Sequence, residues 1–326
     1  MSSPTPPALT QDQATVLVHR VLDAVDTALV GKRDQMTLVL AGVLAGGHVL
    51  LEDLPGLGKT LAARSLSQAL GLEFTRAQFT PDLLPADLTG SYIFDQNTSE
   101  FSFREGPIFT GLLLADEINR TPPKTQSALL EAMQERQVTV EGHTFMLPRP
   151  FHVLATANPI EHEGTYPLPE AQLDRFLLRL AFGYPSLEEE WEVLGRRMER
   201  RREEVVVDAV LDSAGLLAVQ DCVEDIHVAE SVGRYAIDLV RATRDHQDTL
   251  VGASPRGSLA LLLCSRALAL IEGRDFVIPE DVKRLAVPAL GHRIVIRPEL
   301  WLNNVAPESI VQAVLDQVPV PDAETP

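Results

Sequence analysis

A lysine and a threonine that follow a glycine-rich loop are the first residues in this chain suited to phosphate chemistry. The segment from His48 to Thr60 reads HVLLEDLPGLGKT, which has the order of an apolar strand, a loop and the start of a helix. Gly56 and Gly58 allow the loop backbone to bend sharply and to approach a ligand closely. Lys59 can then reach β- and γ-phosphates, and the Thr60 hydroxyl can ligate Mg²⁺. The pattern predicts a site for ATP and Mg²⁺.

The loop is expected to hold the phosphates through backbone N–H groups and the positive end of the following helix. The residues assigned to this role are Asp53, Leu54, Pro55, Gly56, Leu57, Gly58, Lys59, Thr60 and Leu61. Asp53 stands where the usual loop pattern has its first glycine. Its carboxylate could repel a phosphate, or it could turn away and hold the loop, and the sequence leaves both arrangements open.

Two adjacent carboxylates form the second chemical signal. Asp116 and Glu117 come directly after the apolar run Leu112–Ala115, which indicates a buried strand that delivers both side chains at its end. This is the Walker B arrangement. Asp116 is assigned to hold Mg²⁺ together with Thr60, and Glu117 to orient and deprotonate the attacking water. A solvated Asp-Glu turn is the alternative, which the apolar run before it disfavours.

Composition narrows the class of protein. The chain has 326 residues, enough for two domains, and a formal net charge of −18, which argues against sequence-independent binding to nucleic acid. Its two cysteines are too few for a disulfide framework. The longest apolar run, Thr37–Leu51, is shorter than the roughly 20 residues of a membrane span. We therefore expect no membrane span, no leader segment and a cytoplasmic location.

The elements that must position these residues change in character along the chain. Apolar runs at residues 49–51, 112–115, 151–156 and 177–182, together with the segment Glu73–Gln78, predict five strands, with helices between them. Short alternating runs predict hairpins within Ser91–Phe103 and Gln137–Leu147. Beyond residue 185 only helices are predicted. We expect a disordered N-terminus at 1–9, an α/β nucleotide-binding domain at 10–184, a helical domain at 185–320 and a flexible tail at 321–326.

Two longer runs carry a resemblance to a family. The run GLLLADEINRTPPKTQSALLEAMQERQVTVEG, followed by ATANPIEHEGTYPLPEAQLDRF, resembles the MoxR family of AAA+ ATPases. The resemblance implies an AAA+ P-loop core, with a parallel five-stranded sheet flanked by helices, and an all-α C-terminal lid domain. The two predicted hairpins resemble that family's helix-2 insert and pre-sensor-1 insert.

The resemblance also implies roles for single residues. Asn158 matches the sensor-1 position, where an amide can contact the γ-phosphate or the lytic water; a turn-forming Asn is the alternative. Arg175, in LDRF, matches the arginine finger that reaches a neighbouring subunit's γ-phosphate, with Arg179 as a weaker rival. Arg256, in ASPRG, matches sensor 2. Taken alone, each arginine could be an ordinary surface residue.

Other positions are assigned less firmly or differ from the pattern of the family. Gln78 stands where related ATPases keep a polar residue that restrains the catalytic glutamate, and Val30-Gly31 where adenine packs. Ala157 and His162 stand where this family is expected to have glutamine. The basic run RRMERRREE, residues 196–204, is either a contact with a partner or a solvated helix face.

The leading hypothesis is a Mg²⁺-dependent ATP hydrolase of the MoxR type. A finger supplied by a neighbour implies a homo-oligomer, and the resemblance implies a hexameric ring that remodels protein clients, including proteins with von Willebrand factor A domains. One alternative is an ATP-gated binding module with little turnover. Another is a DNA-acting AAA+ motor or transcriptional activator, which the acidic charge and the absence of a GAFTGA motif disfavour.

Overall fold

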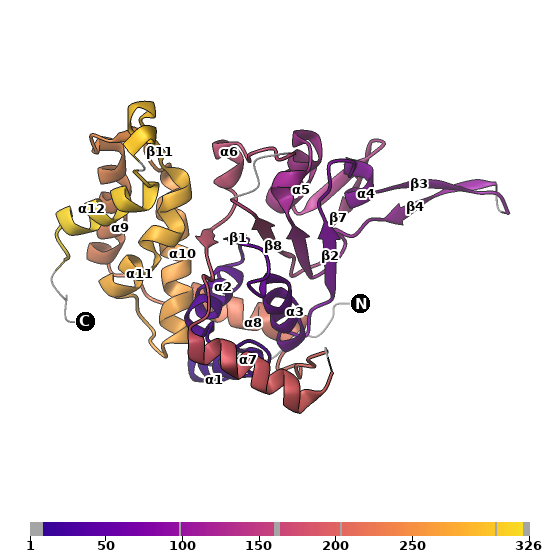
Figure 1. The fold of residues 1–326 in the computed structure, drawn as a ribbon, viewed down its shortest axis with the longest axis horizontal. Helices are drawn as coiled ribbons and strands as arrows, with labels where there is room; N and C mark the ends of the chain where they lie inside the picture. Colours follow the sequence, from indigo (N-terminus) through magenta and orange to yellow (C-terminus); the bar gives the residue numbers. More distant parts are fainter. Residues whose placement is uncertain (1–8, 98, 160–163, 203, 304, 322–326) are drawn as a thin grey trace.

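The computed structural model describes residues 9–97, 99–159, 164–202, 204–303 and 305–321 (Figure 1). The N-terminus and the tail that we expected to be disordered and flexible lie outside these residues, apart from Leu9 and Pro321, and so does His162. The Leu9 carbonyl accepts a hydrogen bond from Cys222 Sγ at 3.4 Å.

A five-stranded parallel sheet forms the centre of the molecule and confirms the predicted core. Its strands are β1 (Val49–Glu52), β2 (Phe74–Gln78), β5 (Leu112–Asp116), β8 (His152–Ala157) and β9 (Leu178–Leu180). They lie in the order β2-β5-β8-β1-β9. Every neighbouring pair is parallel. The carboxyl ends of all five strands therefore meet at one edge of the sheet, where ligands of open α/β sheets bind.

The continuous apolar runs become strands because helices cover both faces of the sheet. The first-domain helices are α1 (Gln11–Asp26), α2 (Arg33–Leu44), α3 (Lys59–Ala69), α4 (Pro85–Thr89) and α5 (Pro123–Glu135). On β5, Leu112 and Leu114 pack with α1–α3, whereas Leu113 and Ala115 pack with α4 and α5. Successive side chains of a strand point to opposite faces, so a strand covered on both sides reads as an unbroken apolar run.

Two hairpins leave this core where they were predicted. They are β3 (Gly90–Asp95) with β4 (Glu100–Glu105), and β6 (Gln137–Val140) with β7 (His143–Met146). The β3–β4 hairpin extends well beyond the body of the molecule (Figure 1). Near its base the Phe103 ring stacks on Phe145 of the second hairpin, with 3.9 Å between the ring centroids. Aromatic stacking therefore holds the two hairpins together.

The C-terminal part is mainly helical. The short helix α6 (Glu170–Leu173) still precedes β9 of the sheet. The helices after residue 185 are α7 (Leu187–Arg200), α8 (Ser213–Glu224), α9 (Glu230–Asp245), α10 (Pro255–Ile271), α11 (Pro279–Leu290) and α12 (Pro307–Gln317). We expected helices alone beyond residue 185, but the structure adds a ribbon of β10 (Thr249–Val251) and β11 (Val295–Ile296). Strands of three and two residues are too short to show a period of two in the sequence.

The first helices after residue 185 contact the α/β part. The Arg196 guanidinium of α7 donates to the carbonyls of Asp26 and Thr27 at the end of α1, at 2.6 and 3.1 Å. Gln220 of α8 donates to the Val43 carbonyl of α2 at 2.8 Å. Helices α9–α12 gather at one side of the sheet (Figure 1). The predicted domain boundary at 184/185 stays a prediction.

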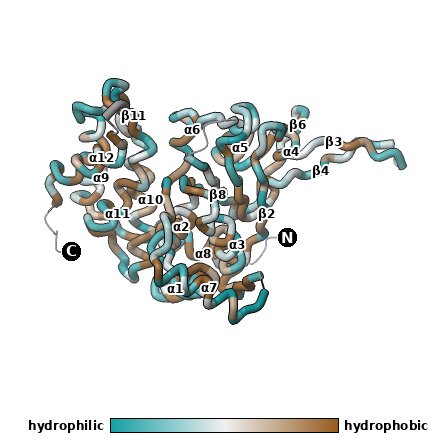
Figure 2. Tube along the Cα trace, in the orientation of Figure 1, coloured by the Kyte–Doolittle hydropathy of each residue, from teal (hydrophilic) through white to brown (hydrophobic). Residues whose placement is uncertain are grey.

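The hydrophobic segments gather inside both parts, as Figure 2 shows by colour. One buried cluster joins α2 to α10 and α11, so the α/β part and the lid share a core. Within the described ranges, no helix is long and apolar enough to cross a membrane.

Candidate active site

The loop between β1 and α3 has the backbone shape that phosphate binding needs. Gly56 and Gly58 have φ angles of 83° and 84°, in the left-handed region that side chains with a Cβ rarely adopt. Gly58 is the N-cap of α3, which begins at Lys59. The first N–H groups of the helix therefore lie next to the loop, where the helix dipole favours an anion.

A cavity of about 410 Å³ lies beside this loop, at the carboxyl ends of β1, β5 and β8. Its lining residues are Pro55, Gly56, Gly58, Lys59, Thr60, Leu61, Arg76, Asp116, Glu117, Thr156, Ala157 and Asn158. We call it the phosphate cavity. The structure thus brings together the lysine, the threonine, both Walker B carboxylates and Asn158, which are separated by about a hundred residues of chain.

The carboxylate of Asp53 faces away from the loop, so the structure shows the second of the two arrangements left open by the sequence. Its Oδ2 accepts hydrogen bonds from the backbone N–H groups of Phe182 and Gly183, at 2.6 and 2.7 Å. Its Oδ1 accepts one from the N–H of Leu54 at 2.8 Å. Asp53 therefore fixes the start of the loop to the chain after β9 instead of contacting a phosphate; neither it nor Leu54 lines the phosphate cavity.

The Lys59 ammonium is held at the base of the loop. Its Nζ donates a hydrogen bond to the backbone carbonyl of Asp53. Burial lowers the pKa of Lys59, and the carboxylates of Asp53, Asp116 and Glu117 oppose that shift. A phosphate would add negative charge beside this ammonium and favour its charged form.

Thr156 on β8 holds the two Walker B residues at the end of β5. Its Oγ1 donates to Asp116 Oδ1 at 2.6 Å and accepts from the backbone N–H of Glu117 at 2.8 Å. Glu117 itself has φ 58° and ψ 49°, a left-handed conformation that is costly for a non-glycine residue. This conformation ends the strand and turns the chain into the segment Ile118–Arg120.

The Glu117 carboxylate accepts hydrogen bonds from the side chains of Gln78 and Arg120. Its Oε2 accepts from Gln78 Nε2 at 2.8 Å and from Arg120 Nη1 at 3.1 Å. The contact from Gln78 is the one that the family resemblance implied. Gln78 lies directly opposite Asp116 in the β2–β5 pairing, which explains how it reaches the next residue.

Arg76 belongs to the site, and the sequence analysis missed it. Its Nε and Nη2 donate to Asp116 Oδ2 at 3.0 and 2.6 Å, and Nη2 also donates to Gln78 Oε1 at 2.9 Å. Arg76 and Gln78 are two residues apart on β2 and so share a face of the strand. That spacing could have indicated Arg76 once Gln78 had been assigned to the site.

Asn158 follows directly after β8 and lines the phosphate cavity with only 5% of its surface exposed. Asn119 Nδ2 donates to the Asn158 carbonyl at 3.0 Å, which ties the end of β8 to the segment after Glu117. The position agrees with the expected sensor-1 residue, although its contact with a phosphate stays a prediction.

The two remaining arginines lie elsewhere. Arg175, just after α6, lines a separate cavity of about 530 Å³ with Glu131 and Glu135 of α5. Arg256, at the start of α10, has its Nε 4.0 Å from Asp174 Oδ2. Neither lines the phosphate cavity of its own chain. The rival, Arg179, pairs with Glu52 at 3.1 Å and with Glu308.

An apolar cavity of about 560 Å³ adjoins the phosphate cavity and shares Gly56, Gly58 and Leu61 with it. Val30, which we expected beside the adenine, lines this cavity. Its other lining residues are Ala28, Leu29, Lys32, Leu57, Pro185, Glu190, Val193, Leu194, Arg196, Arg197, Arg200 and Val205. The lining is mainly apolar, as is usual for sites of small organic ligands, and the place of the adenine stays a prediction.

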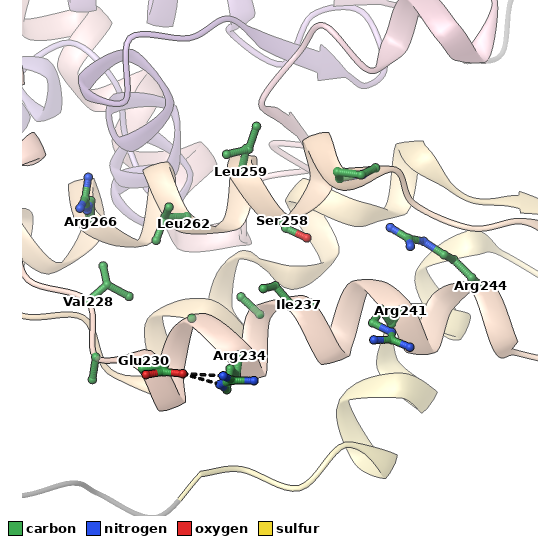
Figure 3. Close-up of a pocket in the computed structure, with 14 residues that line it drawn as sticks. Val228, Glu230, Arg234, Ile237, Arg241, Arg244, Ser258, Leu259, Leu262 and Arg266 are labelled. Atoms are coloured by element: carbon green, nitrogen blue, oxygen red, sulfur yellow. Dashed lines mark hydrogen bonds and ion pairs between the residues drawn. The ribbon is translucent and has the colours of Figure 1, made fainter.

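A further cavity, larger than the phosphate cavity, is a different kind of site. It measures about 950 Å³ and lies in the lid between α9 and α10 (Figure 3). Ile237, Leu259 and Leu262 form its apolar part, and Arg241 lies along its rim. The one carboxylate among its lining residues, Glu230, already pairs with an arginine. Cavity volume is therefore a poor guide to the nucleotide site here, because this larger cavity has no phosphate-binding loop.

Mg²⁺ fits the donor set at the phosphate cavity. A nucleotide-bound Mg²⁺ takes one or two protein oxygens together with phosphate oxygens and water, and Asp116 and Thr60 supply one carboxylate and one hydroxyl. In the described part of the chain, no group of three or more His, Cys, Asp or Glu side chains is placed to hold a metal ion by protein ligands alone.

Comparisons with known proteins agree with this geometry. Residues 48–178 match the ATPase family associated with various cellular activities (AAA), and residues 241–314 match an AAA lid domain. The chain is 47% identical to the uncharacterized protein YeaC of Bacillus subtilis, over 95% of this chain and 97% of that protein. It is 42% identical to Chaperone MoxR1 of Mycobacterium tuberculosis, over 93% and 82%. A crystal structure from Cytophaga hutchinsonii superimposes with a TM-score of 0.89 at 39% identity, covering 96% of this chain and 97% of that one.

Proposed function

The chain belongs to the MoxR family of AAA+ ATPases, and from this premise we propose that it hydrolyses Mg²⁺–ATP to remodel protein partners. The observation that carries the proposal is the convergence of Lys59, Asp116 and Glu117 on one cavity beside a glycine loop with left-handed backbone. A phosphate-binding cation, a metal ligand and a general base are the groups that γ-phosphate hydrolysis needs.

The residues of the phosphate cavity divide the work. The loop N–H groups and Lys59 bind the β- and γ-phosphates, while Thr60 and Asp116 hold Mg²⁺. Mg²⁺, when bound, neutralises charge on the phosphate oxygens. Glu117 accepts a proton from the attacking water, so that the γ-phosphoryl group leaves ADP as phosphate. Asn158 orients that water, and the apolar cavity beside Val30 takes the adenine.

The site is completed by a neighbouring copy. Arg175 is separated from the phosphate cavity of its own chain, and the guanidinium makes one hydrogen bond among the described residues, to the Ala171 carbonyl at 3.2 Å. A cation so placed supports the assignment as a finger that acts in trans, which requires a head-to-tail interface. We propose a ring of six copies, as the family resemblance implies.

The lid supplies the link to mechanical work. Asp174 precedes Arg175 and accepts from Arg293 Nε of the lid at 2.7 Å, with Arg256 Nε 4.0 Å away on the same carboxylate. A movement of the lid would shift Asp174 through these contacts and would therefore move the adjacent Arg175. We propose that Arg256 acts as sensor 2 through this contact.

The kind of partner is proposed from the name of one relative and from the charge of the chain. The name Chaperone MoxR1 supports a protein client, and we propose a protein with a von Willebrand factor A domain as one class of client. The net charge of −18 supports a partner other than nucleic acid. A cytoplasmic location stays part of the proposal.

Glu117→Gln tests the hydrolysis. The amide keeps the size of the side chain but cannot take a proton, so ATP binding should stay within a few-fold of wild type while phosphate release falls by about 10²–10⁴. Fluorescent-nucleotide anisotropy measures the first and a steady-state phosphate assay the second. Glu199→Gln, an exposed position of α7 that lines neither the phosphate cavity nor the cavity of Arg175, is the matched control. Unchanged turnover in Glu117→Gln would remove Glu117 from its role.

The same assay separates the competing function. The bonds from Gln78 to Glu117 and from Arg76 to Asp116 hold both carboxylates in the described structure, which would suit an ATP-gated module with little turnover. Such a module predicts that the wild-type protein assembles with ATP and releases no phosphate.

A further inference from the structure

We propose that Arg76 is a positioning residue that couples the metal ligand Asp116 to the general base Glu117. Its guanidinium and Mg²⁺ compete for the same oxygen of Asp116, and the exchange frees the amide of Gln78 that restrains Glu117. The inference rests on the proposed ATPase function and names a control built into that site.

The strand pairing places the relay. Gln78 lies opposite Asp116 in the β2–β5 register, and Arg76 lies opposite Leu114. Side chains two residues apart share a face of a strand, whereas Ala77 between them is buried in the core on the other face. Arg76 and Gln78 therefore both reach the end of β5 from the edge strand of the sheet.

The contacts at Asp116 leave one oxygen for exchange. Oδ1 accepts from the Thr156 hydroxyl at 2.6 Å, which fixes the carboxylate in place. Oδ2 accepts from both Nε and Nη2 of Arg76, at 3.0 and 2.6 Å. A Mg²⁺ ion bound to Oδ2 demands octahedral geometry and carries two positive charges, so it and the two-pronged arginine contact exclude each other.

The displaced arginine also affects the base. Arg76 Nη2 donates to Gln78 Oε1 at 2.9 Å, while Gln78 Nε2 donates to Glu117 Oε2 at 2.8 Å. The first bond fixes the orientation of the amide and thereby points its NH₂ group at Glu117. When the guanidinium leaves Asp116, this fixed orientation is lost and Glu117 can turn to a water. Metal occupancy is thus transmitted to the base through two side chains.

The solvent exposure of the pair allows the exchange. The Arg76 side chain is 49% exposed and that of Asp116 is 12% exposed. A half-exposed guanidinium can move into solvent, or toward the phosphates that it would face in the same cavity, without leaving a buried charge unpaired. Without Arg76, two adjacent carboxylates would attract Mg²⁺ more strongly.

Arg76→Gln tests the competition through binding, with no turnover involved. A fluorescent, non-hydrolysable ATP analogue is titrated first in EDTA and then with rising Mg²⁺. The Mg²⁺ concentration at half-maximal enhancement should fall roughly two- to tenfold in the variant, whereas affinity in EDTA should fall because a cation facing the phosphates is lost. The ratio of the affinities with and without Mg²⁺ therefore rises, which a merely structural role would not produce.

Two further variants make the test specific. Arg120→Gln removes a different contact to Glu117, at 3.1 Å, and should leave the Mg²⁺ midpoint at its wild-type value. Arg76→Lys keeps the charge beside Asp116 but loses the fork, so its midpoint should stay near wild type while basal phosphate release rises as Gln78 is freed. Equal thermal melting of all three variants shows that the fold is intact.

Two results would overturn the inference: a Mg²⁺ midpoint in Arg76→Gln equal to or above that of wild type, or a midpoint shift of the same size in Arg120→Gln. If the wild-type protein binds no nucleotide under any condition, the proposed function fails instead. The two failures are therefore distinguishable.

Discussion

The phosphate cavity and the surface around Arg175 differ in how far one chain completes them. In the cavity, both Walker B carboxylates have donors from the same chain, through Thr156, Gln78 and Arg76. At the Arg175 surface, the arginine lines the same cavity as Glu131 and Glu135, and among the described residues its guanidinium donates one hydrogen bond, to a backbone carbonyl. One region is pre-organised within a single chain, and the other holds an arginine whose proposed role requires a second copy.

That difference shows what a motif can and cannot locate. Lys59, Asp116 and Glu117 converge because their strands are neighbours in one sheet, so the fold of a single chain explains their role. Arg175 belongs to the same set of motifs but lies outside the cavity. Its proposed role therefore depends on an interface between copies.

The largest expected effect is the loss of turnover in Arg175→Ala. A finger supplied in trans contributes about 10³–10⁵ to the rate, so phosphate release should fall by 10³ or more while ATP binding stays near wild type, since the phosphate cavity is untouched. Steady-state phosphate release and nucleotide anisotropy measure the two quantities under conditions that support assembly. A near-normal rate would place the finger elsewhere.

Mixing two inactive variants shows whether the arginine acts across an interface. Arg175→Ala retains a complete phosphate cavity, and Glu117→Gln retains the arginine. Mixed rings should therefore regain part of the wild-type rate at those interfaces where the intact Arg175 meets an intact Glu117. No recovery in a mixture that demonstrably co-assembles would contradict action in trans.

A smaller effect is expected at Asp53, on the pre-organised side of the comparison. Asp53→Gly restores the usual loop glycine but leaves the N–H groups of Phe182, Gly183 and Leu54 without their acceptor. The expected cost is on the order of 3 kcal/mol in the free energy of unfolding, with weaker ATP binding because the loop loses its anchor. Urea unfolding and nucleotide titration measure both.

Asp53→Asn is the matched control, because it keeps one acceptor oxygen and removes the charge. It should retain most of the stability and of the affinity for ATP. Had the carboxylate acted by repelling phosphate, both variants would bind ATP more tightly than the wild type, and that result would contradict the anchoring role.

The Asp53 contact also marks the boundary of what the sequence could predict. The five strands of the central sheet, the loop, the Walker B pair and both hairpins follow from local patterns of apolar residues, glycines and carboxylates, whereas β10 and β11 do not. The partner of Asp53, Phe182, lies 129 residues further along the chain, so no local pattern could choose between its two arrangements.

Arg76 and Thr156 were missed for the same reason. Arg76 acts through the register of β2 against β5, and Thr156 through the neighbouring position of β8, and both are properties of the assembled sheet. Taken alone in the sequence, an arginine and a threonine in strands indicate nothing more than strand residues. The proposed role of Arg175 is harder still to predict from local sequence, because it depends on contact with a second copy of the chain.

The last prediction concerns the opposite ends of the strands that carry the phosphate cavity. His48 comes just before β1, and His152 begins β8. His48 Nδ1 accepts from the Val153 N–H at 2.9 Å and Nε2 contacts the Met133 carbonyl at 3.2 Å. His152 Nδ1 contacts the Gly47 carbonyl at 2.9 Å. Both rings are neutral, because each accepts a hydrogen bond on its second nitrogen: His48 Nδ1 accepts from Val153, and His152 Nε2 accepts from Gln220 Nε2 at 3.2 Å.

Burial lowers the pKa of His48 to about 3 and that of His152 to about 4. The folded pKa values lie below the unfolded value of about 6.5, so this stability is fully present above about pH 6.5 and is lost as the pH falls toward the folded values. Between pH 7 and 5 each ring should account for a loss of about 2 kcal/mol in the free energy of unfolding.

Urea unfolding at pH 7 and pH 5 measures this loss. In His152→Asn the free energy of unfolding should fall by about 2 kcal/mol less than in the wild type, because the substituted side chain does not titrate in this range. Arg175→Ala should keep the wild-type pH dependence, since Arg175 contacts neither histidine. An equal loss in His152→Asn and wild type would mean that protonation of this ring does not control the stability of the strands beneath the phosphate cavity.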